Sequence, residues 1–315
     1  MKILANEGIT QGGVDILEDK GYEVVITKVA QEQLENFIND NGIDVIIVKN
    51  NTQIQQELID ACPSLKLIAA GGSSVDNIDI QYAIDQGLQV VNSNEGSANA
   101  IGELVFAHLL GMARNLHQSN REMPLEGDMN FKGLHKLYRG RELRNKTLGI
   151  IGITPSGIAT AKIAIGLGMR VVMSDPEVEE TSVELDFFDG QSVYFNFNAI
   201  PLDELLDESD FISLHLQDAS QFKLGENEFK KVKEGVGIIN CYQSGLVDEV
   251  ALVEAINKGT VKFAGLDVFE NEPNPEIQLL MNPSLSLSPH IRNATDEAQE
   301  KINIELANQI TALLS

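Results

Sequence analysis

Short hydrophobic runs alternate with amphipathic segments along almost the whole chain. Runs rich in Val, Ile, Leu and Ala predict buried strands, and segments with apolar residues three or four positions apart predict helices. In the first part of the chain, strands are predicted over residues 1–5, 23–26, 44–48, 65–70 and 88–92, and helices over residues 13–20, 30–40, 54–62 and 80–86. This alternation is typical of a parallel sheet with helices on both faces.

A second series of the same kind begins near residue 147. A long helical pattern over residues 98–117 and a polar, basic stretch precede it, and another helical pattern over residues 295–314 closes the chain. The strands predicted in this series cover residues 148–152, 170–174, 211–214, 237–240, 263–266 and 285–288. The fold class is therefore α/β, with two doubly wound parallel-sheet domains.

The first strand of the second series leads into the turn GITPSG, Gly152 to Gly157. A glycine-rich turn between a strand and a helix is where dinucleotides rest their pyrophosphate, and its usual pattern is GxGxxG. Here the second glycine is replaced by Thr154. Asp175 follows Gly152 by 23 residues, at a strand end where a carboxylate accepts ribose hydroxyls and favours NAD over NADP. An ordinary strand–helix turn is the alternative for the turn taken alone.

A parallel sheet binds its ligand beyond the carboxyl ends of its strands. The cofactor hypothesis therefore places further cofactor contacts at the ends of the later strands, on His215, Cys241 and Asp267, beside Ser156 in the turn. The alternatives are a buried thiol for Cys241 and a strand-end turn acid for Asp267.

Charge and cysteine content restrict the partners. The 315 residues carry a formal net charge of −24, which disfavours nucleic acid and anionic membranes as partners because both would be repelled. The longest apolar runs are too short to cross a bilayer, and the N-terminus is predicted to be a strand. The two cysteines, Cys62 and Cys241, provide neither a disulfide framework nor metal-ligand spacing. We expect a cytoplasmic protein of enzyme size without a metal.

Several strings then match one family in order and spacing. They are VDNID at 75–79, AIGEL at 100–104, MSDP at 173–176, SDFISLH at 209–215, GLVDEVALVEAI at 245–256, GLDVFENEP at 265–273 and SPHI at 288–291. Over essentially its whole length the chain resembles the D-isomer-specific 2-hydroxyacid dehydrogenases, and within them the short form of phosphoglycerate dehydrogenase. The resemblance implies a flavodoxin-like substrate domain, residues 1–97 plus 291–315, a Rossmann NAD domain, residues 98–290, and a cleft between them. It also implies a homodimer.

The resemblance assigns the chemistry as well. It implies hydride transfer between NAD and C2 of a small anionic 2-hydroxy or 2-keto acid, most like 3-phosphoglycerate in serine biosynthesis. His290 is then the acid/base, Glu272 orients it, and Asp267 meets the nicotinamide amide. The loop of Gly72, Ser73, Ser74 and Val75 is then the substrate-binding loop.

The departures from the family fall on these same positions. Gln243 stands in NCYQSG where the family has an arginine that grips the substrate carboxylate, so a charged fork is replaced by a neutral amide. In AAGGSSVDN, Ala70 stands at a second arginine position. Arg292 follows the histidine string where small residues are usual, and we expect it to plug the site or face solvent rather than to replace the missing cation.

The cofactor turn differs from the family pattern at two positions, Thr154 and Pro155. Thr154 is a good N-cap and Pro155 suits the first helical position, so the helix should still start there. A branched side chain at the second glycine and a missing N–H at Pro155 weaken the phosphate cradle. The sequence therefore predicts that NAD is bound, but weakly.

Two interpretations of function remain open. One is an NAD-dependent 2-hydroxyacid dehydrogenase, favoured by His290 and Glu272. The other is a catalytically silent relative that acts as a binding protein, scaffold or dimer partner, favoured by Gln243 and Thr154. The basic stretch from Lys136 to Lys146 either attracts a phosphorylated substrate or is a solvated surface near a dimer contact.

Overall fold

The computed structural model describes residues 1–71, 75, 77–93, 95–220 and 222–314. The chain divides into two compact units, one of residues Met1–Ala98 with Asn293–Ser315 and the other of residues Asn99–Arg292. Both are α/β units built on parallel sheets, so the predicted fold class is confirmed. The division of roles between them, substrate in the first and NAD in the second, stays a prediction.

The first unit is a five-stranded parallel sheet in the order β2-β1-β3-β4-β5, the flavodoxin-like order. Its strands are β1 (Lys2–Ala5), β2 (Glu23–Ile26), β3 (Val45–Val48), β4 (Leu67–Ala70) and β5 (Gln89–Asn92). Its helices are α1 (Gln11–Asp19), α2 (Gln31–Asn41), α3 (Gln56–Ala61), α4 (Ile80–Asp85) and α12 (Asp296–Leu313). The last helix belongs here because it buries Ile302, Leu306 and Ile310 in one of the two cores of this sheet.

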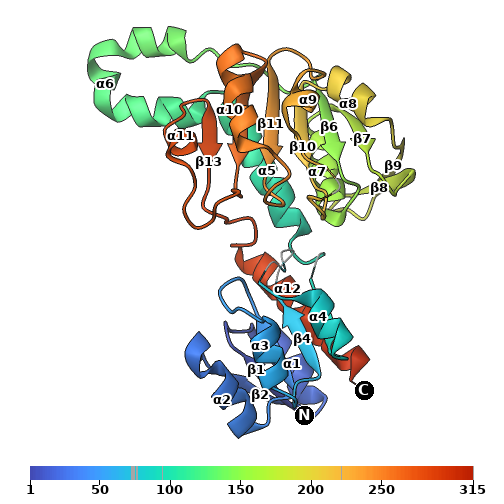
Figure 1. Ribbon diagram of the computed structural model, residues 1–315. Coiled ribbons are helices and arrows are strands. Elements are labelled where there is room, and N and C mark those ends of the chain that lie inside the picture. The colour runs from blue at the N-terminus through green and yellow to red at the C-terminus, as the bar shows by residue number, and fades with distance from the viewer. Residues whose placement is uncertain (72–74, 76, 94, 221, 315) are drawn as a thin grey trace. The chain divides into compact units, whose positions relative to one another are not determined.

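The second unit has a six-stranded parallel sheet in the order β13-β12-β11-β10-β6-β7 (Figure 1). Its strands are β6 (Thr147–Ile151), β7 (Arg170–Ser174), β10 (Phe211–Leu214), β11 (Val236–Asn240), β12 (Val261–Leu266) and β13 (Leu285–Leu287). Its helices are α5 (Ala98–Ala113), α6 (Leu116–Leu137), α7 (Pro155–Gly166), α8 (Leu202–Glu208), α9 (Glu226–Phe229), α10 (Glu249–Lys258) and α11 (Ile277–Leu280). β6 and β10 are neighbours although β7 follows β6 in sequence, so the strand order reverses between them.

Two local predictions were wrong. The helix predicted over 98–117 ends at Ala113, because Asn115 takes a left-handed conformation (φ 52°) and starts a new helix, α6. α6 extends into the stretch that was predicted only as polar and basic, and Figure 1 shows it as a bent arm leading away from the sheet of its unit. The bend lies at Asn130, whose backbone is not helical.

A two-stranded antiparallel hairpin was not predicted. It consists of β8 (Glu180–Asp186) and β9 (Ser192–Asn198), joined through a turn that contains Asp189 and Gly190. In the described part of the chain, no helix is both long and apolar enough to cross a membrane. Nor does any group of three or more His, Cys, Asp or Glu gather there in a way that could hold a metal ion.

Candidate functional site

The turn after β6 and the end of β10 meet where the strand order reverses. In open α/β sheets this is the place where ligands bind. Gly152, at φ 106°, directly follows β6, and a Cβ at this position would lie 2.5 Å from the carbonyl carbon of His215. A Cβ on Gly157 would lie 2.3 Å from the carbonyl oxygen of Gly152. The first and third glycines of the turn are thus required by the packing of the backbone itself.

The helix start is formed as expected. Thr154 is the N-cap of α7 in an extended conformation, its Oγ1 accepts the Gly157 N–H at 3.3 Å, and Pro155 occupies the first turn. This confirms the predicted cap. It also removes donors from a phosphate cradle, because the Gly157 N–H is satisfied by the cap and Pro155 has no N–H.

Asp175, at the end of β7, engages a third group of the turn. Its Oδ2 accepts the Ile153 N–H at 2.6 Å, and its Oδ1 accepts the N–H groups of Glu177 and Val178 at 2.9 and 3.0 Å. A carboxylate offers about four lone-pair sites, so one remains on Oδ2 for a ribose hydroxyl. Asp175 can therefore still accept a hydroxyl from the ribose of a dinucleotide. The Ile153 N–H, however, already donates to Asp175 and is not available to a phosphate.

The hollow beside this turn is acidic. It encloses about 370 Å³ and is lined by Ile153, Thr154, Pro155, Asp175, Pro176, Glu177, Val178, Leu216, Gln217 and Asp218. Three of these side chains are carboxylates, and no Lys or Arg is among the described residues that line it. A diphosphate placed here would meet like charge and few free donors, so the residues fit the ribose of NAD and fit its pyrophosphate poorly.

His215 and Cys241 lie under the turn rather than in an open site. His215 is fully buried, with Ser156 Oγ 2.9 Å from its Nδ1 and Ser213 Oγ 2.8 Å from its Nε2. Burial lowers the pKa of His215 to about 3, so the ring is neutral at physiological pH. Burial also raises the pKa of the Cys241 thiol, which keeps it protonated. Both serve the packing of the strand ends in this structure.

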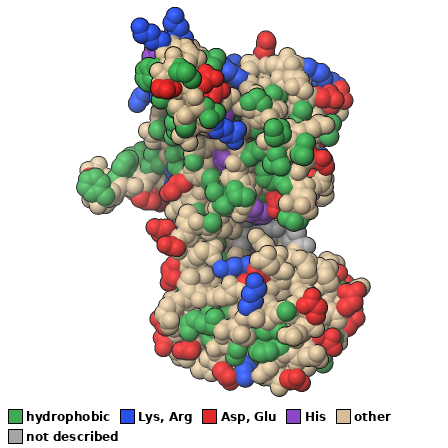
Figure 2. Space-filling view, turned by 90° about the vertical axis from the view of Figure 1, so that its left-hand side faces the viewer, with side chains coloured by type: hydrophobic (Ala, Val, Ile, Leu, Met, Phe, Trp, Pro, Cys, Tyr) green, Lys and Arg blue, Asp and Glu red, His purple; other side chains and the backbone are tan. Residues whose placement is uncertain are grey.

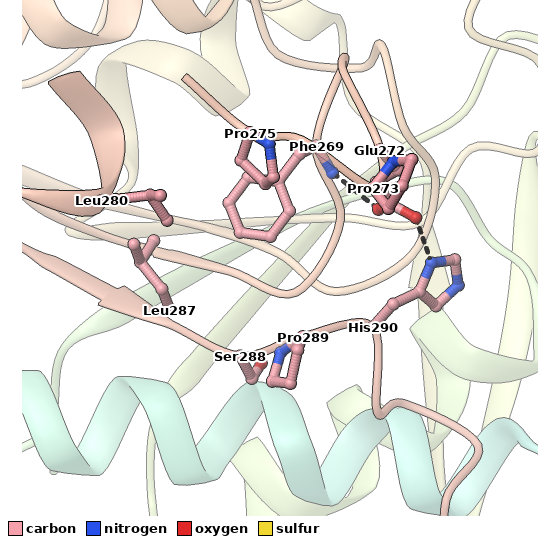
Figure 3. Close-up of a pocket in the computed structure, with 9 residues that line it drawn as sticks. All are labelled: Phe269, Glu272, Pro273, Pro275, Leu280, Leu287, Ser288, Pro289 and His290. Atoms are coloured by element: carbon pink, nitrogen blue, oxygen red, sulfur yellow. Dashed lines mark hydrogen bonds and ion pairs between the residues drawn. The ribbon is translucent and has the colours of Figure 1, made fainter. Parts of the chain in front are cut away.

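The predicted catalytic pair is formed. His290 Nδ1 lies 2.7 Å from Glu272 Oε2, and Glu272 Oε1 accepts the Phe269 N–H at 2.9 Å (Figure 3). With Glu272 ionised, Nδ1 carries the proton that it donates, and Nε2 is left to exchange a proton with a ligand. Nε2 makes no hydrogen bond to any residue in the described ranges, and the side chain is 24% exposed.

Asp267 holds the segment that carries the histidine. It is completely buried at the end of β12, and its carboxylate accepts the Ser288 hydroxyl at 2.5 Å and the N–H groups of Ile291 and Arg292 at 2.9 Å. Its backbone carbonyl accepts the His290 N–H at 2.9 Å. These contacts match the strand-end turn acid that was the alternative for this residue; contact with nicotinamide stays a proposal.

Sequence reasoning missed the partners of Asp267. Ser288 Oγ is also 2.9 Å from His108 Nε2, and His108 Nδ1 is 2.8 Å from Ser286 Oγ. His108 is buried on α5, and burial lowers its pKa. The pairing spans 178 and 180 residues of sequence, so no local pattern signals it.

A mostly apolar cavity of about 430 Å³ adjoins the pair. It is lined by Phe269, Glu272, Pro273, Pro275, Leu280, Leu287, Ser288, Pro289 and His290. In Figure 3 the imidazole and the carboxylate stand at one end of this cavity and Leu280 and Leu287 at the other. No cation of the described chain lines it.

Neither Gln243 nor Arg292 places a positive charge where the family arginine would grip a carboxylate. Gln243 is half-buried after β11, and its carbonyl accepts the side-chain amide of Asn240 at 2.8 Å. Arg292 is only 2% exposed, and its Nη1 donates to the Tyr242 carbonyl beside Gln243. Of the two roles expected for Arg292, plugging the site or facing solvent, its burial excludes the second. Its guanidinium is anchored inside the protein at the strand end, and the plugging role stays a prediction.

Most of the predicted substrate loop lies outside the described residues. Gly72, Ser73 and Ser74 are among the undescribed positions. Val75 is described, packs partly buried against the core of the first unit, and its carbonyl accepts the Ile78 N–H at 2.9 Å. Its assignment to substrate binding stays a prediction.

Comparisons with known proteins identify relatives of this chain in sequence and in structure. Residues 106–292 match the family described as D-isomer specific 2-hydroxyacid dehydrogenase, NAD binding domain. The chain is 34% identical over 315 residues to the hydroxypyruvate reductase of Thermotoga maritima, covering 98% of this chain and 97% of that protein. It is 34% identical to the D-3-phosphoglycerate dehydrogenase of Archaeoglobus fulgidus, of whose length it spans 56%. A glyoxylate reductase structure from Paecilomyes thermophila aligns with 28% identity and a TM-score of 0.81, covering 100% of this chain and 95% of that one.

Proposed function

Because the chain belongs to the D-isomer-specific 2-hydroxyacid dehydrogenase family, whose members are NAD-dependent oxidoreductases acting on a CH–OH group, we propose that it acts on a small 2-hydroxy or 2-keto acid with a weakened NAD site. The observation that carries this proposal is the 2.7 Å contact between His290 Nδ1 and Glu272 Oε2. A histidine held by a carboxylate, with its other nitrogen open, is the arrangement that proton exchange with an alcohol requires.

The proton chemistry follows from the pair. Glu272 fixes the tautomer and the ring plane, so that Nε2 accepts the hydroxyl proton during oxidation and returns it during reduction. Asp267 holds the backbone of His290 and so sets the direction of Nε2. Bound NAD would accept or supply the hydride at the substrate carbon.

For the substrate, we propose the hydroxypyruvate and 3-phosphoglycerate class. Two relatives at 34% identity carry these names, and this chain spans nearly all of the first and about half of the second. Gln243 then gives the substrate carboxylate neutral N–H donors in place of a charged fork, which predicts weak binding of the acid. A homodimer in the cytoplasm is part of the same proposal.

A second candidate is a catalytically silent relative that serves as a binding or scaffold protein or as a dimer partner. The occupied donors of the turn favour it, because Asp175 takes the Ile153 N–H and Thr154 takes the Gly157 N–H. So does the buried Arg292, whose guanidinium donates to the Tyr242 carbonyl at the end of β11 instead of extending into an open site.

One experiment separates the two candidates. NADH binding is titrated by fluorescence, and NADH oxidation is then followed with hydroxypyruvate, phosphohydroxypyruvate and glyoxylate. The dehydrogenase proposal expects measurable binding with a high Kd and slow turnover on at least one acid. Absence of NADH binding at millimolar concentration would leave only the silent relative.

The matched variant is Glu272→Gln. It should lower turnover at least about tenfold, because an oriented general base contributes roughly 10²–10⁴-fold, while the Kd for NADH stays unchanged. Turnover that is equal in both proteins would mean that His290 and Glu272 do not perform the reaction.

A further inference from the structure

A basic hollow lies where the ends of α5 and α6 meet the loop that leads into β6. It encloses about 820 Å³ and is lined by Arg114, His135, Lys136, Tyr138, Arg139, Gly140, Arg141 and Glu142. Four cations and one carboxylate therefore face one hollow, in a protein whose net charge is −24. Figure 2 shows acidic side chains spread over the visible face and basic ones gathered in a few groups, most densely along the top edge.

The four cations have no partners in the described chain. Arg114, Lys136, Arg139 and Arg141 form no ion pair and no side-chain hydrogen bond with any described residue, although the chain contains 47 Asp and Glu against 23 Lys and Arg. Elsewhere the lysines pair readily with this excess of acid, as Lys223 does with Glu270 at 2.7 Å. Unpaired cations that converge repel one another, so an anion bound between them is stabilising.

The backbone under the hollow is fixed. The Arg141 N–H donates to the Ala113 carbonyl at 2.8 Å, and the Tyr138 N–H donates to the Leu134 carbonyl at 3.0 Å. Gly140 packs so closely on the end of α5 that a Cβ there would lie 2.5 Å from the Ala113 carbonyl oxygen. The two arginines on either side of Gly140 therefore extend from an anchored turn, which lowers the entropy cost of gathering them around a ligand.

Helix dipoles explain only part of the cluster. Arg114 follows α5, and Lys136 lies in the last turn of α6, where a cation gains about 0.3–1 kcal/mol. Arg139 and Arg141 lie beyond both helices and gain nothing of this kind. A polyanionic macromolecule is disfavoured because it would meet the negative field of the whole molecule, whereas a small ligand meets only the hollow.

We propose that this hollow binds a small molecule with two linked phosphate groups, either inorganic pyrophosphate or a nucleoside diphosphate. The net charge of the lining, four cations against Glu142, matches a diphosphate better than a single phosphate. The volume lies in the range of small-molecule pockets, and the Tyr138 ring offers a surface for a base. None of the lining residues is among those assigned above to NAD or to the hydroxyacid, so the binding test does not depend on turnover.

The test is calorimetric titration of the full chain at low ionic strength with pyrophosphate, ADP and inorganic phosphate. Pyrophosphate and ADP should bind more tightly than phosphate, and added salt should weaken them. The double variant Arg139→Gln/Arg141→Gln should weaken both by at least about tenfold per arginine, the loss expected for charge-assisted bonds. Because ADP can also occupy the NAD site beside Asp175, only the binding that the double variant loses is assigned to this hollow. Within that part, equal affinity for both probes assigns recognition to the diphosphate alone, and tighter ADP binding adds the base.

The matched control removes the same charge elsewhere. Lys20→Gln/Lys301→Gln changes two exposed lysines that also form no ion pair with a described residue, and it should leave both affinities within about twofold. Thermal unfolding of each variant checks that the fold is kept. Failure of the wild type to bind pyrophosphate at millimolar concentration, or unchanged affinity in the double arginine variant, overturns the proposal.

Discussion

Asp267 fixes the backbone of His290. The carbonyl of Asp267 accepts the His290 N–H at 2.9 Å, and its carboxylate accepts the next two backbone N–H groups. His290 has φ 53°, a left-handed conformation that a residue with a side chain rarely adopts without support. The acid at the end of β12 therefore supports the conformation that directs the imidazole toward Glu272.

Asp267→Asn should destabilise the protein by about 1–3 kcal/mol. The amide keeps one acceptor oxygen but turns an NH₂ group toward N–H or O–H donors, so at least one buried donor loses its partner. The measurement is the free energy of unfolding in urea, together with the NMR signal of the His290 ring. That signal should shift or broaden as the segment loosens.

Asp203→Asn is the matched control. Asp203 is exposed and forms a surface ion pair with Lys231 at 2.7 Å, so its change should cost less than about 1 kcal/mol. If the two variants lose the same free energy of unfolding and the His290 signal does not shift, Asp267 does not hold the left-handed backbone conformation of His290.

The strands that build the site were predictable, because buried runs of β-branched residues mark them locally. All eleven predicted strands are present, most with ends within one or two residues of those expected. The cap at Thr154 and Pro155 was equally predictable, since capping depends on a few adjacent residues. The contact between His290 and Glu272 was expected from the family resemblance, and the structure places the two side chains together.

What could not be predicted depends on distant residues or on single backbone angles. The left-handed Asn115 splits one helical pattern into α5 and α6, and nothing in the apolar spacing indicates it. The β8–β9 hairpin does carry a local signal, the turn dipeptide Asp189-Gly190 between two segments that alternate in polarity. The bonds of Asp175 with Ile153 and of Arg292 with Tyr242 join segments far apart in sequence, and they decide how many donors remain for a ligand.

Gly152→Ala should cost about 3 kcal/mol or more. Its φ of 106° disfavours any side chain, and the new Cβ would lie 2.5 Å from the His215 carbonyl carbon, which is backbone and cannot move aside easily. Urea unfolding measures the loss. Gly21→Ala is the comparison, because Gly21 has φ 81° and no atom within 4 Å of the added Cβ, so only about 1 kcal/mol is expected there.

Thr154→Gly combined with Gln243→Arg should raise turnover. The first change frees the Gly157 N–H for a phosphate at a cost of only a few tenths of a kcal/mol in capping. The second places a charged fork beside the substrate acid, worth about 1.5–3 kcal/mol per bond, or roughly 10- to 100-fold in affinity. The single variants separate the effects: Thr154→Gly should lower the Kd for NADH, and Gln243→Arg the KM for the keto acid.

An unchanged rate in that double variant would mean that neither the occupied Gly157 N–H nor the missing cation at position 243 limits turnover. If Thr154→Gly alone leaves NADH affinity as it is, the acidic lining around Asp175 rather than the occupied N–H limits the cofactor. Glu177→Gln, which removes one exposed carboxylate from the same lining, would then be the change that tightens NADH binding.

His215 should make the protein less stable in mild acid. Its pKa is lowered from 6.5 to about 3 by burial, so between these values the unfolded chain binds a proton that the folded chain does not. Stability from this group is complete above pH 6.5 and falls as the pH drops, by about 1.4 kcal/mol per unit, or about 2 kcal/mol by pH 5. The measurement is the urea unfolding free energy at several values between pH 8 and pH 5.

His215→Asn isolates the contribution of this one ring. Asparagine retains hydrogen bonds with Ser156 or Ser213 but has no proton to bind in this range, so the variant is less stable at pH 8 and loses less on acidification. The readout is the difference in slope between the two proteins, because other titrating groups contribute equally to both. His135→Asn, at an exposed histidine, should keep the wild-type slope. Parallel curves for wild type and His215→Asn would show that the buried ring is not what links folding to pH.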